Sequence, residues 1–265
     1  MKSSAERLRW WVPLVSALVV VAGLAAARAG AGQEPAEKTT GRWCFAWTPA
    51  LPKGAEERAA LVKGAKWPSA SKITISFLDG DPVVQRKVME QAVKWTREAG
   101  GPANLIFEFR RDGPTDIRIS FKNPGSWSVI GTGCRQIVDP GQPTMNFGWL
   151  DPATDETEYR RVVLHEFGHA IGLIHEHQNP AGGIQWNQVQ VVKDLSGPPN
   201  NWSIPVISHN MFEPYAAHET NFTKVDSKSI MMYPIPANWT LNQFSAGLNT
   251  DLSDLDKAFV REQYP

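Results

Sequence analysis

The chain has 265 residues, of which 42% are hydrophobic and 10% aromatic, and this composition suits a packed core and excludes an intrinsically disordered chain. Its 27 basic and 27 acidic side chains balance to a formal net charge of zero. Proteins that bind nucleic acid or an anionic membrane usually carry a basic excess, so neither is expected as the main partner.

The first 29 residues are predicted to be a secretory signal peptide. A short basic stretch, MKSSAERLR, precedes an almost wholly apolar run over residues 10–27. Residues 27–29 (ARA) then place small side chains at the two positions that a signal peptidase recognises. An uncleaved membrane anchor is the alternative, although the apolar run is short for a full span. We therefore expect a secreted protein, extracellular or periplasmic, that is free of the membrane after cleavage.

Residues 30–66 are rich in Gly, Ala, Glu, Lys and Pro and show only weak periodicity. This pattern predicts a leader or pro-segment laid over a domain, and not a domain of its own. From Trp67 onward the sequence shows the regular apolar patterns of strands and helices, so we expect one domain over residues 67–265.

The elements after Trp67 begin with a strand and a helix. Residues 72–80 alternate apolar and polar side chains, which is typical of a strand that ends in a turn. The helix that follows has Asp81 as its N-cap, Pro82 in its first turn and Gly100 beyond its end.

Three more strands are expected, at residues 104–110, 116–122 and 143–150, with a Gly-rich loop before the last of them. A second helix is predicted over residues 156–172, and the chain then reads mostly as loop until a helix capped at Ser253. This order of elements predicts an α+β fold. We expect an N-terminal twisted mixed sheet with two long helices, followed by a C-terminal irregular half that ends in a helix.

The segment VVLHEFGHAIGLIHEHQNP, residues 162–180, contains four histidines and two glutamates. His165 and His169 are four residues apart, so on a helix they share one face and lie about 6 Å apart along the axis. Both imidazoles can then bind one ion. Glu166 lies about 100° further round the helix, beside such an ion, where a base can take a proton from water.

His175 can join the other two histidines only if the helix breaks. On a continuous helix it would lie about 9 Å beyond His169. Gly172 is placed to let the chain turn back, because glycine adopts positive φ without the penalty of a Cβ. Three imidazole ligands leave a fourth position for water, as in catalytic zinc sites and unlike closed structural ones.

Two other ligand sets stay open at this point. His177 could be the third ligand in place of His175, but it falls outside the register that Gly172 sets. A distant glutamate, Glu213 or Glu219, could also serve, but that arrangement gives no reason for the glycine and the third histidine.

The chain resembles the astacin branch of the metzincins, in which a glutamate follows the third histidine. The resemblance is carried by HEFGHAIGLIHE at residues 165–176 and SIMMYP at residues 229–234. The upstream stretches SWSVIGTGC and MNFGWL also resemble the family, so that the resemblance covers roughly residues 67–265. It implies a metzincin-like catalytic domain with Met231 under the zinc site. Tyr233 would ligate zinc at rest and hydrogen-bond the reacting carbonyl. The chain departs from animal astacins after the third histidine, where it reads HQNPAGG, and therefore resembles the simpler, bacterial-type enzymes.

These features predict a secreted zinc endopeptidase. Glu166 is the expected general base and Tyr233 the expected hydrogen-bond donor to the oxyanion. The expected zinc ligands are His165, His169 and His175.

The expected substrate is a protein or peptide, and the enzyme is expected to be a monomer. The predicted strand at residues 144–149 offers an edge along which an extended peptide could add. A non-catalytic zinc-binding recognition module with the same fold is the alternative, and the ligands alone also permit a non-proteolytic zinc hydrolase. A recognition module would not need Glu166 or Tyr233.

The two cysteines, Cys44 and Cys134, allow two hypotheses. Paired cysteines are common in exported proteins, so we expect a disulfide, which would close a loop of about ninety residues and stabilise the fold by roughly 4–5 kcal/mol. In the second hypothesis Cys44, which is flanked by aromatic residues, binds zinc as a fourth ligand. The enzyme would then stay inactive until the chain is cut between Cys44 and Trp67.

Overall fold

The structure is a computed structural model that describes residues 44–47, 64–111, 113–198, 200–214 and 221–265. The expected signal peptide, residues 1–29, and most of the expected leader, residues 30–66, lie outside the described residues.

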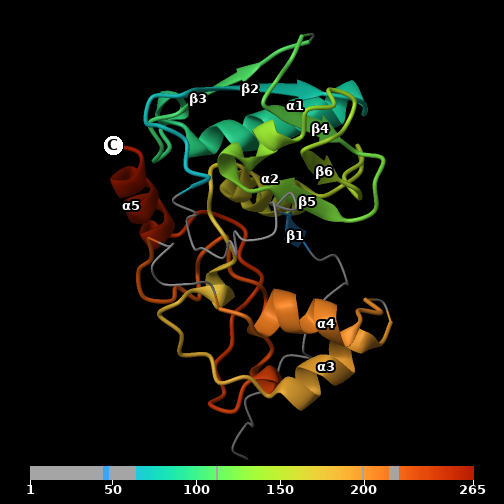
Figure 1. The fold of residues 1–265 in the computed structure, drawn as a ribbon, viewed down its shortest axis with the longest axis vertical. Coiled ribbons are helices and arrows are strands. Elements are labelled where there is room, and N and C mark those ends of the chain that lie inside the picture. The colour runs from blue at the N-terminus through green and yellow to red at the C-terminus, as the bar shows by residue number, and fades with distance from the viewer. Residues whose placement is uncertain (1–43, 48–63, 112, 199, 215–220) are drawn as a thin grey trace, which may run out of the picture. The chain divides into compact units, whose positions relative to one another are not determined.

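One mixed sheet forms the first half of the described fold (Figure 1). All neighbouring strands run parallel except β5 and β6, which are antiparallel. The strands lie in the order β1 (Cys44–Trp47), β5 (Ser126–Val129), β6 (Met145–Phe147), β4 (Ile117–Ser120), β2 (Lys72–Phe77) and β3 (Ile106–Phe109). The α+β class and the mixed sheet that we predicted are therefore confirmed.

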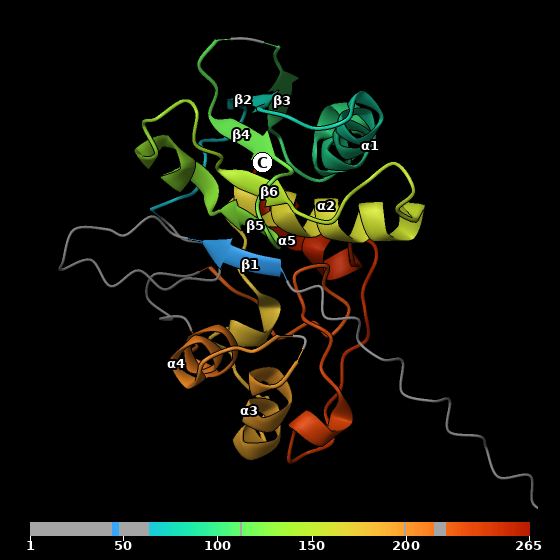
Figure 2. The same cartoon turned by 90° about the vertical axis from the view of Figure 1, so that its right-hand side faces the viewer.

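Two helices, α1 (Pro82–Ala92) and α2 (Glu156–Ala170), pack against each other on one face of this sheet (Figure 2). The side chain of Asp81 accepts from the Val83 N–H, so the predicted N-cap is confirmed. The helix was expected to end just before Gly100, but α1 ends at Ala92 and two 3₁₀ turns follow it, because Thr96 between them is extended and forms a β-bridge with Ala103.

Strand β5 was not predicted, because its residues lie in the Gly-rich stretch that we interpreted as a loop. The strand predicted at residues 143–150 is present as the shorter β6. Strand β6 is hydrogen-bonded to β4 on one side and to β5 on the other, so it lies inside the sheet.

The second half of the chain ends in α5 (Asp254–Gln263), as predicted. Ser253 is its N-cap, and a reciprocal pair of hydrogen bonds between Ser253 and Asp256 forms a capping box. The structure adds α3 (Gln188–Ser196) and the short α4 (Ile204–Ile207), which pack against each other and were not predicted.

Two hydrophobic clusters hold the described chain together. The first joins the sheet to α1, α2 and α5, and the second joins α3 and α4 to the loops around Trp239. Met231 belongs to the first cluster, whereas Met232 and Tyr233 belong to the second. The segment 229–233 therefore connects the two cores. Among the residues that the structure describes, no helix is long and apolar enough to cross a membrane.

Candidate active site

Helix α2 is almost wholly buried from Tyr159 onward and is held in place by hydrogen bonds from outside the helix. The indole of Trp95 donates to the Leu164 carbonyl at 3.0 Å, and the indole of Trp67 donates to the Ala170 carbonyl at 2.8 Å. The second bond satisfies a carbonyl that has no partner within the helix, because the last turn lacks a following N–H. Both tryptophans therefore fix the position of the helix that carries the first two histidines.

The chain leaves α2 at Gly172, which has a φ of +104°. The Gly172 N–H donates to the His169 carbonyl at 2.8 Å, and the Leu173 N–H donates to the Gly168 carbonyl at 2.9 Å. This pair of bonds is a Schellman C-cap, which needs a left-handed residue at the glycine position. The predicted break of the helix is therefore confirmed, and it returns the chain toward His175.

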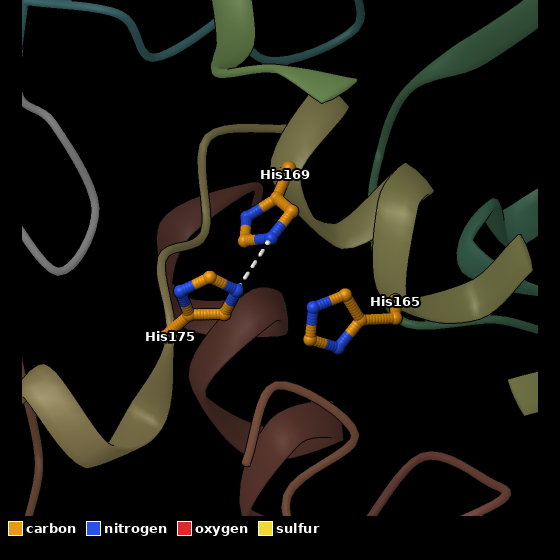
Figure 3. Close-up of side chains that lie close together, drawn as sticks. All are labelled: His165, His169 and His175. Carbon is orange, nitrogen blue, oxygen red and sulfur yellow. Dashed lines mark hydrogen bonds between the residues drawn. The ribbon is translucent and has the colours of Figure 1, made fainter. Parts of the chain in front are cut away.

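The three histidines converge, as Figure 3 shows. One nitrogen from each ring of His165, His169 and His175 lies within 4.8 Å of the other two, and all three residues are buried. The Nε2 atoms of His169 and His175 are 3.2 Å apart. This separation is in keeping with two lone pairs that face one small cation.

Two of the three rings are oriented by backbone carbonyls. His165 Nδ1 lies 2.8 Å from the Ile230 oxygen, and His169 Nδ1 lies 2.8 Å from the Leu173 oxygen. A carbonyl can only accept, so in each ring Nδ1 carries the proton and Nε2 holds the lone pair. His165 Nε2 is buried and has no hydrogen-bond partner among the described residues. An orphaned buried nitrogen beside two other imidazoles fits a metal ligand.

The protonation state of the cluster also fits a metal. Burial lowers the pKa of His165 and His175 well below the ordinary value, and it lowers the pKa of His169 to about 4. The rings are therefore neutral at pH 7, the form in which histidine binds a metal. Three neutral imidazoles are a donor set that suits zinc.

Glu166 and Tyr233 both lie close to the histidine cluster. Glu166 follows His165 on α2, and its side chain is fully buried. The Tyr233 ring lies 4.2 Å from the His175 ring and 6.2 Å from the His165 ring, measured between centroids. The structure thus brings all five predicted site residues into one region.

His177 lies beside the three histidines but outside their group. Its Nε2 donates to the Asn210 carbonyl at 2.7 Å, and its ring stacks on Tyr233 with a centroid distance of 4.6 Å. Glu213 contacts His209 and Gln178, whereas Glu219 lies outside the described residues. Among the described residues, the converging ligand atoms thus belong to His165, His169 and His175, and not to His177 or Glu213.

Sequence reasoning did not single out Gly168, although the site depends on it. A Cβ on Gly168 would lie 2.3 Å from Met231 Sδ, so the methionine packs directly on the helix between the two histidines. The signal was available in the sequence, since glycine in a helix interior usually has a packing or functional reason.

The expected disulfide between Cys44 and Cys134 is wrong, because Cys134 is a free, buried thiol in the first hydrophobic cluster. Burial raises its pKa to about 12. Cys134 thus behaves as a small apolar side chain of the core. The backbone of Cys44 lies in β1, in register with Ser126 of β5.

The expected substrate edge at residues 144–149 is also wrong, because β6 has a neighbouring strand on each side. Strands β5 and β1 both pack against α2, and β5 pairs in parallel with β1 on its outer side. Strand β1, residues 44–47, is therefore the edge strand on this side of the sheet, and its backbone covers residues 126–129 of β5.

Neither the protein-family models nor the curated proteins match the sequence. Two solved structures of myroilysin do match. One is 40% identical with a TM-score of 0.74, and the match covers 77% of this chain and 98% of that chain. The other is 37% identical with a TM-score of 0.60, and covers 84% of this chain and 91% of that one. High choriolytic enzyme 1, a hatching enzyme zinc-protease from the medaka fish Oryzias latipes, is 16% identical with a TM-score of 0.51, over 76% of this chain and 94% of that one. This last likeness shows a common fold alone.

Proposed function

The chain belongs to the astacin-like metzincins, the zinc metallopeptidases that its histidine motif resembles, and we propose that it is a secreted endopeptidase that cleaves proteins or peptides. The observation that carries the proposal is the convergence of three buried, neutral imidazoles beside a buried glutamate and a tyrosine.

The residues that would hold the zinc are His165, His169 and His175. Bound zinc lowers the pKa of water and polarises a carbonyl group. The hydrogen bonds at Nδ1 of His165 and His169 support this assignment, because they leave each Nε2 lone pair free.

Glu166 and Tyr233 would carry the proton transfer and the charge stabilisation. The Glu166 carboxylate takes the proton of the attacking water and then delivers it to the leaving amine nitrogen. The Tyr233 hydroxyl donates a hydrogen bond to the oxyanion as it forms, an interaction that is stronger in the transition state than in the ground state. A recognition module would need neither group, so that alternative is not favoured.

The β5 edge would receive the substrate and the leader would block it. An extended peptide can add to an exposed strand through main-chain hydrogen bonds, and residues 126–129 would become such a strand beside α2 once β1 has left. Strand β1 of the leader already pairs with it. This arrangement supports a role for residues 30–66 as a pro-segment, which follows a signal peptide at residues 1–29 and is released by a cut between β1 and Trp67.

Limited proteolysis tests the role of the leader. Cleavage within residues 48–63 is expected to raise the rate at which a peptide substrate is hydrolysed. An intact chain that is as active as the cut one would show that β1 does not block the edge.

Zinc analysis of two variants tests the ligand set. The wild-type protein should contain about one zinc, lose peptidase activity with a chelator and regain it with added zinc. His175→Ala should lose most of its zinc affinity, whereas His177→Ala should retain the metal. The reverse result would make His177 the third ligand.

A further inference from the structure

A chain of hydrogen bonds connects His165 to the carboxylate of Asp256, on the C-terminal helix. His165 Nδ1 donates to the Ile230 carbonyl at 2.8 Å. The same peptide group presents the Met231 N–H on its other side, and this N–H donates to Ser229 Oγ at 3.0 Å. Ser229 Oγ in turn lies 2.6 Å from Asp256 Oδ1.

The direction of each bond in this chain is fixed. Ser229 has one hydroxyl proton, and because its oxygen accepts from the Met231 N–H, that proton is available to the carboxylate. Asp256 Oδ2 accepts from the Ile230 N–H at 2.8 Å and from the Ser253 N–H at 2.9 Å. Every donor therefore points away from His165 and toward Asp256, which acts only as an acceptor.

We propose that Asp256 and Ser229 are positioning residues for the zinc ligand His165 and act on it through the Ile230–Met231 peptide group. Hydrogen bonds that all point one way polarise one another, by about 10–30% per bond. A carboxylate at the far end therefore strengthens the bond at Nδ1 and makes Nε2 a better donor to a metal. Carboxylates commonly act on metal-binding histidines by direct contact. Here a serine and a peptide group lie between the two.

His169 provides an internal comparison. Its Nδ1 donates to the Leu173 carbonyl in the turn that ends α2. The carboxylate of Asp256 accepts hydrogen bonds from Ser229, Ile230 and Ser253, the N-cap of α5, and these contacts support His165 and not His169. Loss of the carboxylate should therefore weaken the hydrogen bond at Nδ1 of His165 and leave the hydrogen bond at Nδ1 of His169 unchanged.

Asp256 also caps α5, and this structural role has to be separated from the positioning role. The Asp256 N–H donates to Ser253 Oγ at 2.9 Å, which is the other half of the capping box. Ser253→Ala removes this bond and leaves the contacts of Asp256 with Ser229 and Ile230 in place. Ser229→Ala breaks the chain to His165 and leaves the cap in place. The two serine variants are therefore matched controls for each other.

The experiment measures zinc affinity by competition with a chelator in the full-length protein and in the variants Ser229→Ala, Asp256→Asn and Ser253→Ala. Changes in groups that orient metal ligands typically weaken metal binding by about 10–100-fold, and we expect such a loss for Ser229→Ala and Asp256→Asn. Ser253→Ala should lower the melting temperature and leave zinc affinity within about twofold of wild type, because it removes a cap and no part of the chain to His165. Equal zinc affinity in wild type and Ser229→Ala would overturn the proposal, even if Asp256→Asn does not fold.

A spectroscopic measurement gives the second readout. In zinc-loaded protein with ¹⁵N-labelled histidine, the Nδ1 proton resonance of His165 should move upfield in Ser229→Ala, whereas that of His169 should not move. Equal shifts of both would show a general loosening of the site and would contradict a specific role.

The proposal rests on the ligand role of His165 in the proposed function. A wild-type protein that binds no zinc would refute that function. A wild-type protein that binds zinc as tightly as Ser229→Ala would refute only the positioning role.

Discussion

Met231 packs directly on Gly168, so that a Cβ at position 168 would lie 2.3 Å from the methionine Sδ. Both residues are part of the site framework, since Gly168 lies between two histidines of α2 and Met231 lies in the segment that connects the two hydrophobic clusters. Gly168→Ala should therefore push the helix and this segment apart. We expect a loss of about 1–3 kcal/mol in the free energy of unfolding, the usual cost of overpacking, together with weaker zinc binding.

Thermal unfolding and zinc titration check this prediction, with Gly247→Ala as the control. Gly247 is exposed and a Cβ there would meet nothing within 4 Å. If both alanine variants unfold at the wild-type temperature, Met231 does not constrain the helix.

Tyr233→Phe should lower kcat by roughly ten- to a thousandfold with little change in KM, since it removes a donor that acts in the transition state. The Phe ring should keep the stacking on His177, so the fold and the zinc content should stay unchanged. Steady-state kinetics on a peptide substrate, with zinc analysis of the same sample, check this. A kcat within twofold of wild type would leave Tyr233 as a core residue.

Both cysteines should titrate as free thiols in the denatured, unreduced protein, because Cys134 is unpaired and the chain has 2 cysteines. In the folded Cys44→Ser variant, Cys134 should react slowly with thiol reagents, since burial raises its pKa to about 12. If Cys44 binds zinc as a fourth ligand, Cys44→Ser should also raise the activity of the uncut chain. If no free thiol is detected in the denatured protein, the two cysteines form a disulfide and this prediction is wrong.

Asp116 should contribute to stability at neutral pH and lose that contribution in acid. Burial alone would raise its pKa, but hydrogen bonds from Thr74 and Arg135 outweigh burial and hold the pKa below the ordinary value. Because the pKa is lower in the folded state, the unfolded chain binds the proton more tightly. The stabilisation is complete above the ordinary pKa and disappears as the pH falls through the folded one. The difference in unfolding free energy between wild type and Asp116→Asn should therefore shrink from pH 7 to pH 2, and a constant difference would contradict this account.

The three-histidine cluster could be predicted from the sequence because local geometry brings its members together. His165 and His169 share a helix face through their spacing, and Gly172 determines how the chain turns back to His175. Each of these relationships spans at most ten residues, so the periodicity of the helix and the φ angle of one glycine were enough to place them.

The features that were missed depend on contacts between distant parts of the chain. The position of β6 inside the sheet depends on the order of the strands, and the residue pattern of β6 alone does not indicate which strands lie next to it. Strand β5 has Gly-rich neighbours and becomes a strand by pairing with β6. The count of cysteines gave no information on the burial of Cys134, and Asp256 reaches the 229–231 segment from a helix that begins more than twenty residues later.

The central claim is that the three-histidine site cleaves peptide bonds with Glu166 as the base, and Glu166→Gln tests it most directly. This change keeps the size of the buried side chain and removes its ability to take a proton. The measurement is the rate of peptide cleavage by wild type and Glu166→Gln, each with its zinc content determined. We predict about one zinc in both proteins and a rate at least about a hundredfold lower in the variant, the scale of general-base catalysis. A zinc-loaded Glu166→Gln protein that cleaves at close to the wild-type rate would contradict the account.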